Sequence, residues 1–231
     1  MGTMTMGKLF ILHGWTYQIS TWDALRAELK THGIEHEFLL MPGLTDGTNP
    51  IWTLDEYVAW LKSKVGEEKV ALYGHSAGGR LSLAFALKYP TQVDRLILED
   101  SAGIPPRGLK RLKREFFKKL SYLTSPVMGS EKIRRAAYTL IRENDYGRAT
   151  PEMRKTLANL VSVDLTPSLS RITCPTLIIW GADDKTTPLK DGLLMHEKIR
   201  GSRLHVIPDA RHSPHITHPK LLAELIAKEL A

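Results

Sequence analysis

Residues 70–81 read Val-Ala-Leu-Tyr-Gly-His-Ser-Ala-Gly-Gly-Arg-Leu, and this stretch decides the fold. Its first four residues are apolar and favour a buried strand, and apolar residues recur at helical spacing from Leu81 to Leu87. Between the two runs stands Gly74-His75-Ser76-Ala77-Gly78, which matches the pattern Gly-x-Ser-x-Gly. The stretch therefore predicts a strand, a sharp turn that carries Ser76, and a helix.

The pattern has a mechanical reason. A serine on so tight a strand-to-helix turn adopts a strained backbone conformation, which is tolerable only when the residues two before and two after it lack side chains. Its hydroxyl then stands above the sheet at the start of a helix, where amide groups and the helix dipole favour developing negative charge. Because the pattern is short, a glycine-rich connection without catalytic use is the alternative. The position between a buried strand and an amphipathic helix favours a nucleophile elbow.

The composition indicates a single domain. The chain has 231 residues, of which 42% are hydrophobic and 25% charged, enough for one core with a small insertion. Apolar runs such as Leu177–Trp180 are far too short to span a bilayer, and the first seven residues do not read as a secretory signal. We therefore expect a cytoplasmic protein. Cys174 is the only cysteine, which excludes an intrachain disulfide and any zinc site built from several cysteines.

Short apolar runs alternate with helical patterns along most of the chain. This alternation predicts right-handed crossovers and one mainly parallel sheet of about six strands with helices on both faces, an α/β fold. Ligands of such sheets bind beyond the carboxyl ends of the strands. The expected strands are Lys8–His13, Glu37–Met41, Val70–Tyr73, Asp94–Glu99, Thr176–Trp180 and Arg203–Ile207. The expected helices are Thr21–His32, a segment from Leu54 to near Gly66, the helix after Ser76, Leu189–Ile199 and Pro219–Leu230.

Residues 105–170 interrupt the alternation. They contain no convincing strand and several helical segments, with breaks at Ser125-Pro126, Thr150-Pro151 and Thr166-Pro167. We expect a helical lid at 105–170, inserted after the fourth strand, over a core formed by residues 1–104 and 171–231. The lid lies over the carboxyl edge of the sheet in this interpretation.

A serine hydroxyl is inert without a base, so it needs an imidazole and a carboxylate that holds the tautomer of that imidazole. Both are expected in loops that leave the carboxyl ends of later strands. Asp183 and Asp184 follow the fifth strand, and His212 and His215 follow the sixth. The order serine, acid, histidine is the one found in hydrolases with this kind of elbow.

These residues resemble the α/β-hydrolase fold family, specifically its small capped members, which include esterases, carbon–carbon bond hydrolases and biotin-pathway methyl esterases. Members typically read Gly-x-x-Asp-x-x-x-Pro at the acid turn, and Gly181 with Pro188 places that aspartate at Asp184. The family's last motif is a small residue, a variable one, a histidine and a proline-led helix start, and 210–214 fit it with His212. The resemblance covers the chain except the lid and implies Ser76, His212 and Asp184 as the catalytic triad.

Acyl transfer also needs donors for the tetrahedral oxyanion. One is expected to be the backbone amide of Ala77, the residue after the nucleophile. By resemblance, the second is the amide of Trp15, with Gly14 letting the backbone approach.

Other polar residues near these motifs receive different roles. Asp100 also ends a strand, where some family members place their acid, so it stays an alternative to Asp184; hydrogen bonding at the lid hinge is the other interpretation. We expect His13 to be a structural hydrogen bonder and His75 to pack beside the site. His215 is expected at the surface or in a capping position.

Because His13-Gly14 follows the start of the sequence closely, we expect the sheet to lack the antiparallel strand pair that this family usually has at the amino terminus.

The net charge of +7 is concentrated in one segment. Residues 105–142 hold eleven basic side chains against Glu115 and Glu131. Apolar residues at helical spacing share this segment, so the first interpretation is a solvated helix that packs an apolar stripe on the core. Transient membrane-surface contact or attraction of anionic substrates are the alternatives. Nucleic acid is not an expected partner, because no aromatic platform or known reading module accompanies the basic residues.

The sequence thus predicts a serine hydrolase that cleaves a small-molecule carboxylic ester through an acyl-enzyme and requires no metal or organic cofactor. The enzymatic alternative is hydrolysis of a carbon–carbon bond in a diketone-type compound by the same triad. The alternative that is not an enzyme is a ligand-binding receptor on the same fold with low turnover. Acyl and alcohol specificity, pathway and oligomeric state stay open, because the lid carries no motif.

Overall fold

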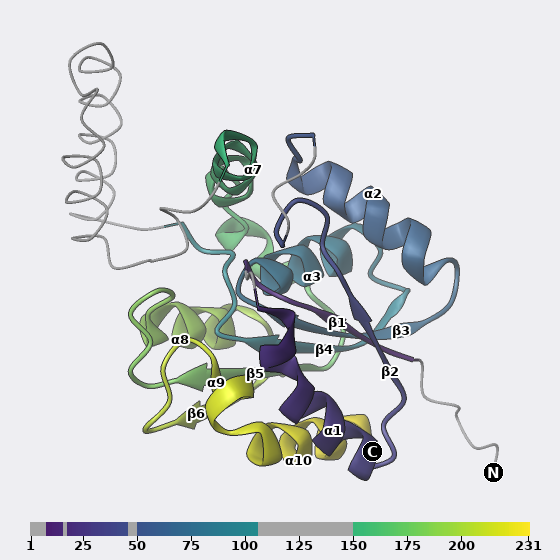
Figure 1. Ribbon diagram of the computed structural model, residues 1–231, viewed down its shortest axis with the longest axis vertical. Helices are drawn as coiled ribbons and strands as arrows, with labels where there is room; N and C mark the ends of the chain where they lie inside the picture. The colour runs from purple at the N-terminus through teal and green to yellow at the C-terminus, as the bar shows by residue number, and fades with distance from the viewer. Residues whose placement is uncertain (1–7, 16–17, 46–49, 106–149) are drawn as a thin grey trace.

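The computed structural model describes residues 8–15, 18–45, 50–105 and 150–231, and six strands of this part form one sheet (Figure 1). Every pair of neighbouring strands is parallel, and the order across the sheet is β2-β1-β3-β4-β5-β6. The expectation of a parallel sheet of about six strands is confirmed. The strands are β1 (Leu9–Leu12), β2 (His36–Leu39), β3 (Val70–His75), β4 (Val93–Glu99), β5 (Thr176–Gly181) and β6 (Arg203–Ile207).

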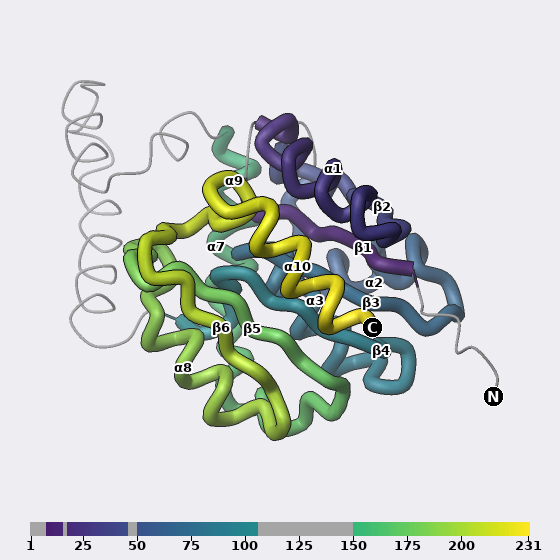
Figure 2. Tube along the Cα trace, turned by 90° about the horizontal axis from the view of Figure 1, so that it is seen from below, coloured from purple at the N-terminus to yellow at the C-terminus, as the bar shows by residue number. Residues whose placement is uncertain are grey.

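Side chains alternate between two buried faces of this sheet, as the period of a strand requires. In β1, Leu9 and Ile11 belong to one hydrophobic cluster, and Phe10 and Leu12 belong to the other. The first face is covered by α1 (Asp23–Thr31) and α10 (Pro219–Leu230), which lie side by side in Figure 2. The second face is covered by α2 (Leu54–Val65), α3 (Ala77–Lys88) and α8 (Leu189–Lys198). Helices on both faces are therefore confirmed.

Local sequence signals explain where several helices begin. Thr53 and Glu56 form a reciprocal capping box at α2, in which each side chain accepts a hydrogen bond from the other residue's amide. Thr150 caps α7 (Pro151–Ser162) through Met153, and Pro151 occupies the first turn. The remaining short elements are η1 (Ile19–Trp22), η2 (Thr166–Arg171) and α9 (Pro214–Thr217).

The second strand ends earlier than the sequence predicts. We expected it to reach Met41, but β2 ends at Leu39. The amide of Met41 donates to Nε2 of His13 at 2.8 Å, so this amide is used by a side chain and not by a strand ladder. This contact ties the residues after β2 to the residue that follows β1.

The expected lid is described only at its end. Residues 150–171 contain α7 and η2 and no strand, and α7 is hydrogen-bonded to Trp52, shortly before the start of α2. The amide of Trp52 donates to Thr156 at 3.0 Å, and Asn159 donates to the carbonyl of Trp52 at 3.1 Å. Residues 106–149, with all the basic side chains of the charged segment, lie outside the described residues. The division into a core and a lid at 105–170 stays a prediction.

All six strands run in one direction, so their carboxyl ends meet at one edge of the sheet. Gly14 follows β1, Ser76 follows β3, Asp100 follows β4, and the loops after β5 and β6 carry Asp184 and His212. Within the described residues, no helix is long and apolar enough to cross a membrane.

Candidate active site

Ser76 stands on the sharp turn between β3 and α3. Its φ of 52° and ψ of −114° lie in a region that side-chain-bearing residues rarely adopt. Its amide donates to the carbonyl of Glu99 at 3.1 Å, and its own carbonyl accepts from the amides of Arg80 and Ala102. The strained conformation is thus held from three sides, which is the geometry of a nucleophile elbow.

The glycines around Ser76 are required by close approach. A Cβ added to Gly74 would lie 2.6 Å from the carbonyl oxygen of Gly78 and 2.5 Å from Oγ of Ser82. A Cβ on Gly78 would lie 2.0 Å from the carbonyl oxygen of Leu12, in β1. The residues two before and two after the serine therefore have no room for a side chain, which is the reason for the sequence pattern.

His212 lies within reach of Ser76. Its Nε2 is 3.2 Å from Oγ of Ser76, and its Nδ1 is 2.8 Å from Oδ2 of Asp184. With the Nδ1 hydrogen donated to the carboxylate, Nε2 is left as an acceptor that faces the serine hydroxyl. The side chain of Asp184 is fully buried, whereas that of His212 is 23% exposed. The structure thus brings together the three residues that the sequence motifs single out, from three separate loops.

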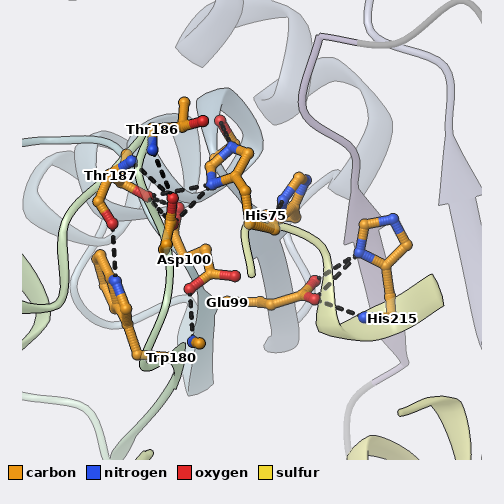
Figure 3. Close-up of polar contacts among 11 residues, drawn as sticks. His75, Glu99, Asp100, Trp180, Thr186, Thr187 and His215 are labelled. Carbon is orange, nitrogen blue, oxygen red and sulfur yellow. Dashed lines mark hydrogen bonds and ion pairs between the residues drawn. The ribbon is translucent and has the colours of Figure 1, made fainter. Parts of the chain in front are cut away.

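Asp184 sits in a tight turn that supplies it with donors. The amides of Thr186 and Thr187 donate to Oδ1 at 2.7 and 3.1 Å, and Oγ1 of Thr187 lies 2.7 Å from Oδ2 (Figure 3). Burial by itself would raise the pKa of the Asp184 carboxyl. The interactions with His212 and the hydrogen bonds from Thr187 and Thr186 outweigh burial, so this pKa lies below its usual value. Asp184 is therefore the ionised partner that fixes the ring of His212.

The acid turn and the histidine loop are joined by their backbones. The amide of Asp183 donates to the carbonyl of Ala210 at 3.0 Å, and the amide of Ala182 donates to that of Ile207 at 2.9 Å. A Cβ on Gly181 would lie 2.2 Å from the carbonyl oxygen of Arg211, so this glycine is needed for the contact. Asp183 itself points to solvent, with Oδ1 4.0 Å from Nζ of Lys185.

The loop after β1 passes directly against the elbow. A Cβ on Gly14 would lie 3.0 Å from Cβ of Ser76 and 2.9 Å from Nδ1 of His75. Ala77 is the first residue of α3, where backbone amides have no partner within the helix. Gly14 therefore brings the backbone next to Ser76, and Trp15 follows it. The oxyanion role of the Trp15 and Ala77 amides stays a prediction.

His13 and His75 are buried and hydrogen-bonded to the main chain. His13 donates from Nδ1 to the carbonyl of Gly14 and accepts from Met41 at Nε2, and burial lowers its pKa to about 4. Nε2 of His75 donates to the carbonyl of His212 at 2.7 Å, and burial lowers its pKa to about 3. Both rings are therefore neutral structural groups beside the site.

Glu99 and His215 form a buried pair behind the triad that the sequence analysis missed. His215 is 2% exposed, so the expected surface position for it is wrong. Oε1 of Glu99 accepts from the amide of His215 at 2.7 Å and lies 3.0 Å from its Nδ1 (Figure 3). Oε2 accepts from the hydroxyl of Tyr73. The His215 ring stacks on Trp22 with centroids 3.8 Å apart. The only sequence signal for this pair was the position of Glu99 at the end of a strand beside Asp100.

Two clusters of possible metal ligands occur in the described part of the chain. One is His75 with Asp100 and His212, and the other is His75 with Glu99 and His215; in each, one ligand atom per residue lies within 4.8 Å of the others. Nε2 of His75 and Nδ1 of His215 are already hydrogen-bonded to protein groups. Both clusters are therefore explained as hydrogen-bond networks of the site.

Comparison with known proteins agrees with this geometry. A family model described as the alpha/beta hydrolase fold matches residues 32–219. The chain belongs to this family.

Relatives of this α/β hydrolase include two kinds of hydrolase. The pimeloyl-[acyl-carrier protein] methyl ester esterase of Aeromonas salmonicida (strain A449) is 28% identical over 94% of this chain and 93% of its own length. The 2-hydroxy-6-oxo-6-phenylhexa-2,4-dienoate hydrolase of Comamonas testosteroni is 30% identical over 67% of this chain and 60% of its own length.

Among solved structures, an α/β hydrolase enzyme from the metagenome of sediments of the Mar Chica lagoon, Morocco, has the same fold. It superimposes with a TM-score of 0.69 at 21% identity, over 96% of this chain and 90% of that one.

Proposed function

We propose that Ser76, His212 and Asp184 are the catalytic triad with which this chain, a serine hydrolase, cleaves carboxylic esters. The observation that carries the proposal is the continuous path from Oγ of Ser76 through the two nitrogens of His212 to Oδ2 of Asp184, with steps of 3.2 and 2.8 Å. Nucleophilic attack by a serine needs this arrangement, in which an imidazole faces the hydroxyl and a buried carboxylate faces the imidazole.

The geometry assigns each proton in the reaction. Nε2 of His212 takes the hydroxyl proton as Oγ of Ser76 attacks the ester carbonyl carbon, and Asp184 stabilises the imidazolium. The tetrahedral intermediate collapses, the alcohol leaves with the proton from His212, and an acyl-enzyme remains. Water then attacks the acyl carbon with His212 as base and releases the carboxylic acid and Ser76.

The oxyanion of both tetrahedral intermediates needs two donors close to Ser76. We assign them to the backbone amides of Ala77 and Trp15. Two contacts support this assignment: Ala77 opens α3, and Gly14 lies against Cβ of Ser76. Each donor of this kind is worth ~10²–10³ in rate.

The relatives favour an ester over a carbon–carbon bond as the substrate. Those named pimeloyl-[acyl-carrier protein] methyl ester esterase align over 94–98% of the chain, whereas those named for dienoate or dienedioate substrates align over 67–74% of it. Cleavage of a carbon–carbon bond in a diketone-type compound is the second candidate, because the same triad serves both. The substrate is a small-molecule or carrier-bound carboxylic ester in the first case.

Hydrolysis of p-nitrophenyl acetate, butyrate, octanoate and palmitate tests the proposal, with wild type, Ser76→Ala and Asp184→Asn. Ser63, which is exposed, gives the matched control Ser63→Ala. We expect kcat/KM to fall ~10³-fold or more in the triad variants and to stay unchanged in the control. A fluorophosphonate should label Ser76, located by mass spectrometry. Labelling at another residue, or turnover that survives Ser76→Ala, would refute the triad.

If diketone-type compounds are cleaved and simple esters are not, the second candidate replaces the first. Binding of ligand without release of product would instead identify a receptor. The cytoplasmic location and the membrane-surface or anionic contact expected of the basic segment stay predictions.

A further inference from the structure

Thr187 is the last residue of the acid turn before Pro188, and its main chain is held on both sides. Its amide donates to Oδ1 of Asp184 at 3.1 Å. Its carbonyl accepts from Nε1 of Trp180 at 2.9 Å (Figure 3). The indole of Trp180 is fully buried, and a Cβ on Gly192 would lie 2.6 Å from it, so α8 packs closely on this ring. Thr187 is therefore fixed between the buried end of β5 and the Asp184 carboxylate.

The hydroxyl of Thr187 lies among three groups of the site. Oγ1 is 2.7 Å from Oδ2 of Asp184, 2.9 Å from the carbonyl oxygen of Asp100 and 3.3 Å from Nδ1 of His212. The hydroxyl has one hydrogen, and the Asp184 carboxylate is both the nearer acceptor and the charged one, which makes the stronger hydrogen bond. The hydrogen therefore points mainly to Asp184, with a weaker branch to the carbonyl of Asp100.

Four donors surround the carboxylate of Asp184. An ionised carboxylate offers about four lone-pair sites on its two oxygens. Oδ1 accepts from the amides of Thr186 and Thr187, and Oδ2 accepts from Nδ1 of His212 and from the Thr187 hydroxyl. Because the Asp184 side chain is fully buried, loss of the hydroxyl would leave one site of a buried charge without a donor. The hydroxyl thus leaves Oδ2 with a single open direction, which is the one toward His212.

We propose that Thr187 is a positioning residue of the triad, whose hydroxyl fixes the rotation of the Asp184 carboxylate so that Oδ2 faces Nδ1 of His212. The proposal rests on the proposed function for its catalytic consequence, but the orientation of the carboxylate does not. His212 must present Nε2 to Ser76, and this needs a fixed acceptor for the hydrogen on Nδ1. A carboxylate that is free to turn would hold the ring less firmly, and small displacements of a base are costly at the chemical step.

Thr187→Val and Thr187→Ser separate the hydroxyl from the shape of the side chain. Valine keeps the branched shape and lacks the hydroxyl, whereas serine keeps the hydroxyl and lacks the methyl group. We expect kcat for p-nitrophenyl acetate to fall about 10- to 100-fold in Thr187→Val with little change in KM, and to stay within about threefold of wild type in Thr187→Ser. Thr31, an exposed residue of α1 whose hydroxyl donates to the carbonyl of Ala27, gives the matched control Thr31→Val, which should keep the wild-type kcat.

Proton NMR of the resting protein reads the orientation of the carboxylate without turnover. The Nδ1 hydrogen of His212, bound to a buried carboxylate, should give a low-field resonance, which is identified by its absence from His212→Gln. We expect this resonance to be lost or to move upfield in Thr187→Val, and to keep its position in Thr187→Ser and Thr31→Val.

Thermal melts establish that each variant is folded. Thr187→Ala lacks the hydroxyl as well, so it takes the place of Thr187→Val in both measurements if the valine variant does not fold. Wild-type kcat in a folded Thr187→Val, equal losses in the valine and serine variants, or an unchanged resonance in Thr187→Val would overturn the proposal. Turnover that survives Ser76→Ala would reject the triad and leave the NMR result standing, so the two failures are distinguishable.

Discussion

Nε2 of His75 donates a hydrogen bond to the main-chain carbonyl of His212 at 2.7 Å. His75 precedes Ser76, the proposed nucleophile, and the contact joins it to the backbone of His212, the proposed base. The ring of His75 is held in turn by Trp22 and His215, with centroids 5.8 and 4.7 Å away. His75 therefore fixes the distance between the elbow and the histidine loop, and it does so as a neutral ring, because burial lowers its pKa to about 3.

Replacing His75 should separate packing from hydrogen bonding. His75→Phe keeps a ring against Trp22 and loses the donor, whereas His75→Gln keeps a donor of similar reach. We expect kcat to fall about 10- to 100-fold in His75→Phe with little change in KM, since small displacements of a base are costly. His75→Gln should keep more of the activity. Steady-state kinetics of both variants on one ester checks this, and equal losses in the two would show that the hydrogen bond is not the important contact.

The elbow glycines allow a second test. Gly78→Ala would place a methyl group 2.0 Å from the carbonyl oxygen of Leu12, so β1 and α3 would have to separate. We expect severe destabilisation and loss of activity. Gly33→Ala is the control: its φ is +70°, which costs roughly 1–2 kcal/mol, but no atom lies within 4 Å of the added carbon. In thermal melts, Gly78→Ala should unfold at a lower temperature than Gly33→Ala. Similar melting temperatures would contradict the steric argument.

The fold and the three site residues could be predicted because their signals are local. Gly74 to Gly78 fixes a turn, and the spacing of Gly181 to Pro188 selects Asp184 over Asp183 within one loop. The pairing of Glu99 with Tyr73 and His215 depends on side chains from β3, β4 and α9. The hydrogen bond from the amide of Gly181 to Asp100 likewise joins residues 81 positions apart. Such contacts leave no periodic pattern in a single sequence, so they became visible only in the structure.

The titration of Asp100 should appear in the stability of the fold. Its pKa is about 9 in the folded chain and about 3.8 unfolded, so the folded state binds the proton more tightly. The resulting contribution to stability is complete below pH ~4 and is lost as the pH rises toward ~9. Asp100→Asn has no such loss. We expect the difference in melting temperature, Asp100→Asn minus wild type, to grow by several degrees from pH 5 to pH 8. A difference that is constant across this range would mean that Asp100 is ionised in the folded protein.

Glu99 has the opposite dependence. Burial opposes its ionisation, but electrostatic interactions with His215 and His75 and the hydrogen bonds from His215 and Tyr73 lower its pKa to about 2. Because this pKa lies below the unfolded value of 4.5, the stabilisation is complete above pH ~4.5 and is lost as the pH falls toward 2. Glu99→Gln removes the buried carboxylate that His215 and Tyr73 contact. Breaking a buried pair costs about 3–5 kcal/mol, so we expect the melting temperature at pH 7 to fall by roughly 6–20 °C.

The pH series decides whether charge is the cause of that loss. The difference in melting temperature between wild type and Glu99→Gln should become smaller from pH 5 to pH 2.5, because protonation of Glu99 then removes the same interaction from wild type. Glu224, an exposed glutamate of α10, provides the control Glu224→Gln, which should follow wild type throughout. A gap that persists unchanged at pH 2.5 would assign the loss to packing, and the buried Glu99–His215 pair would then contribute no charge-dependent stability.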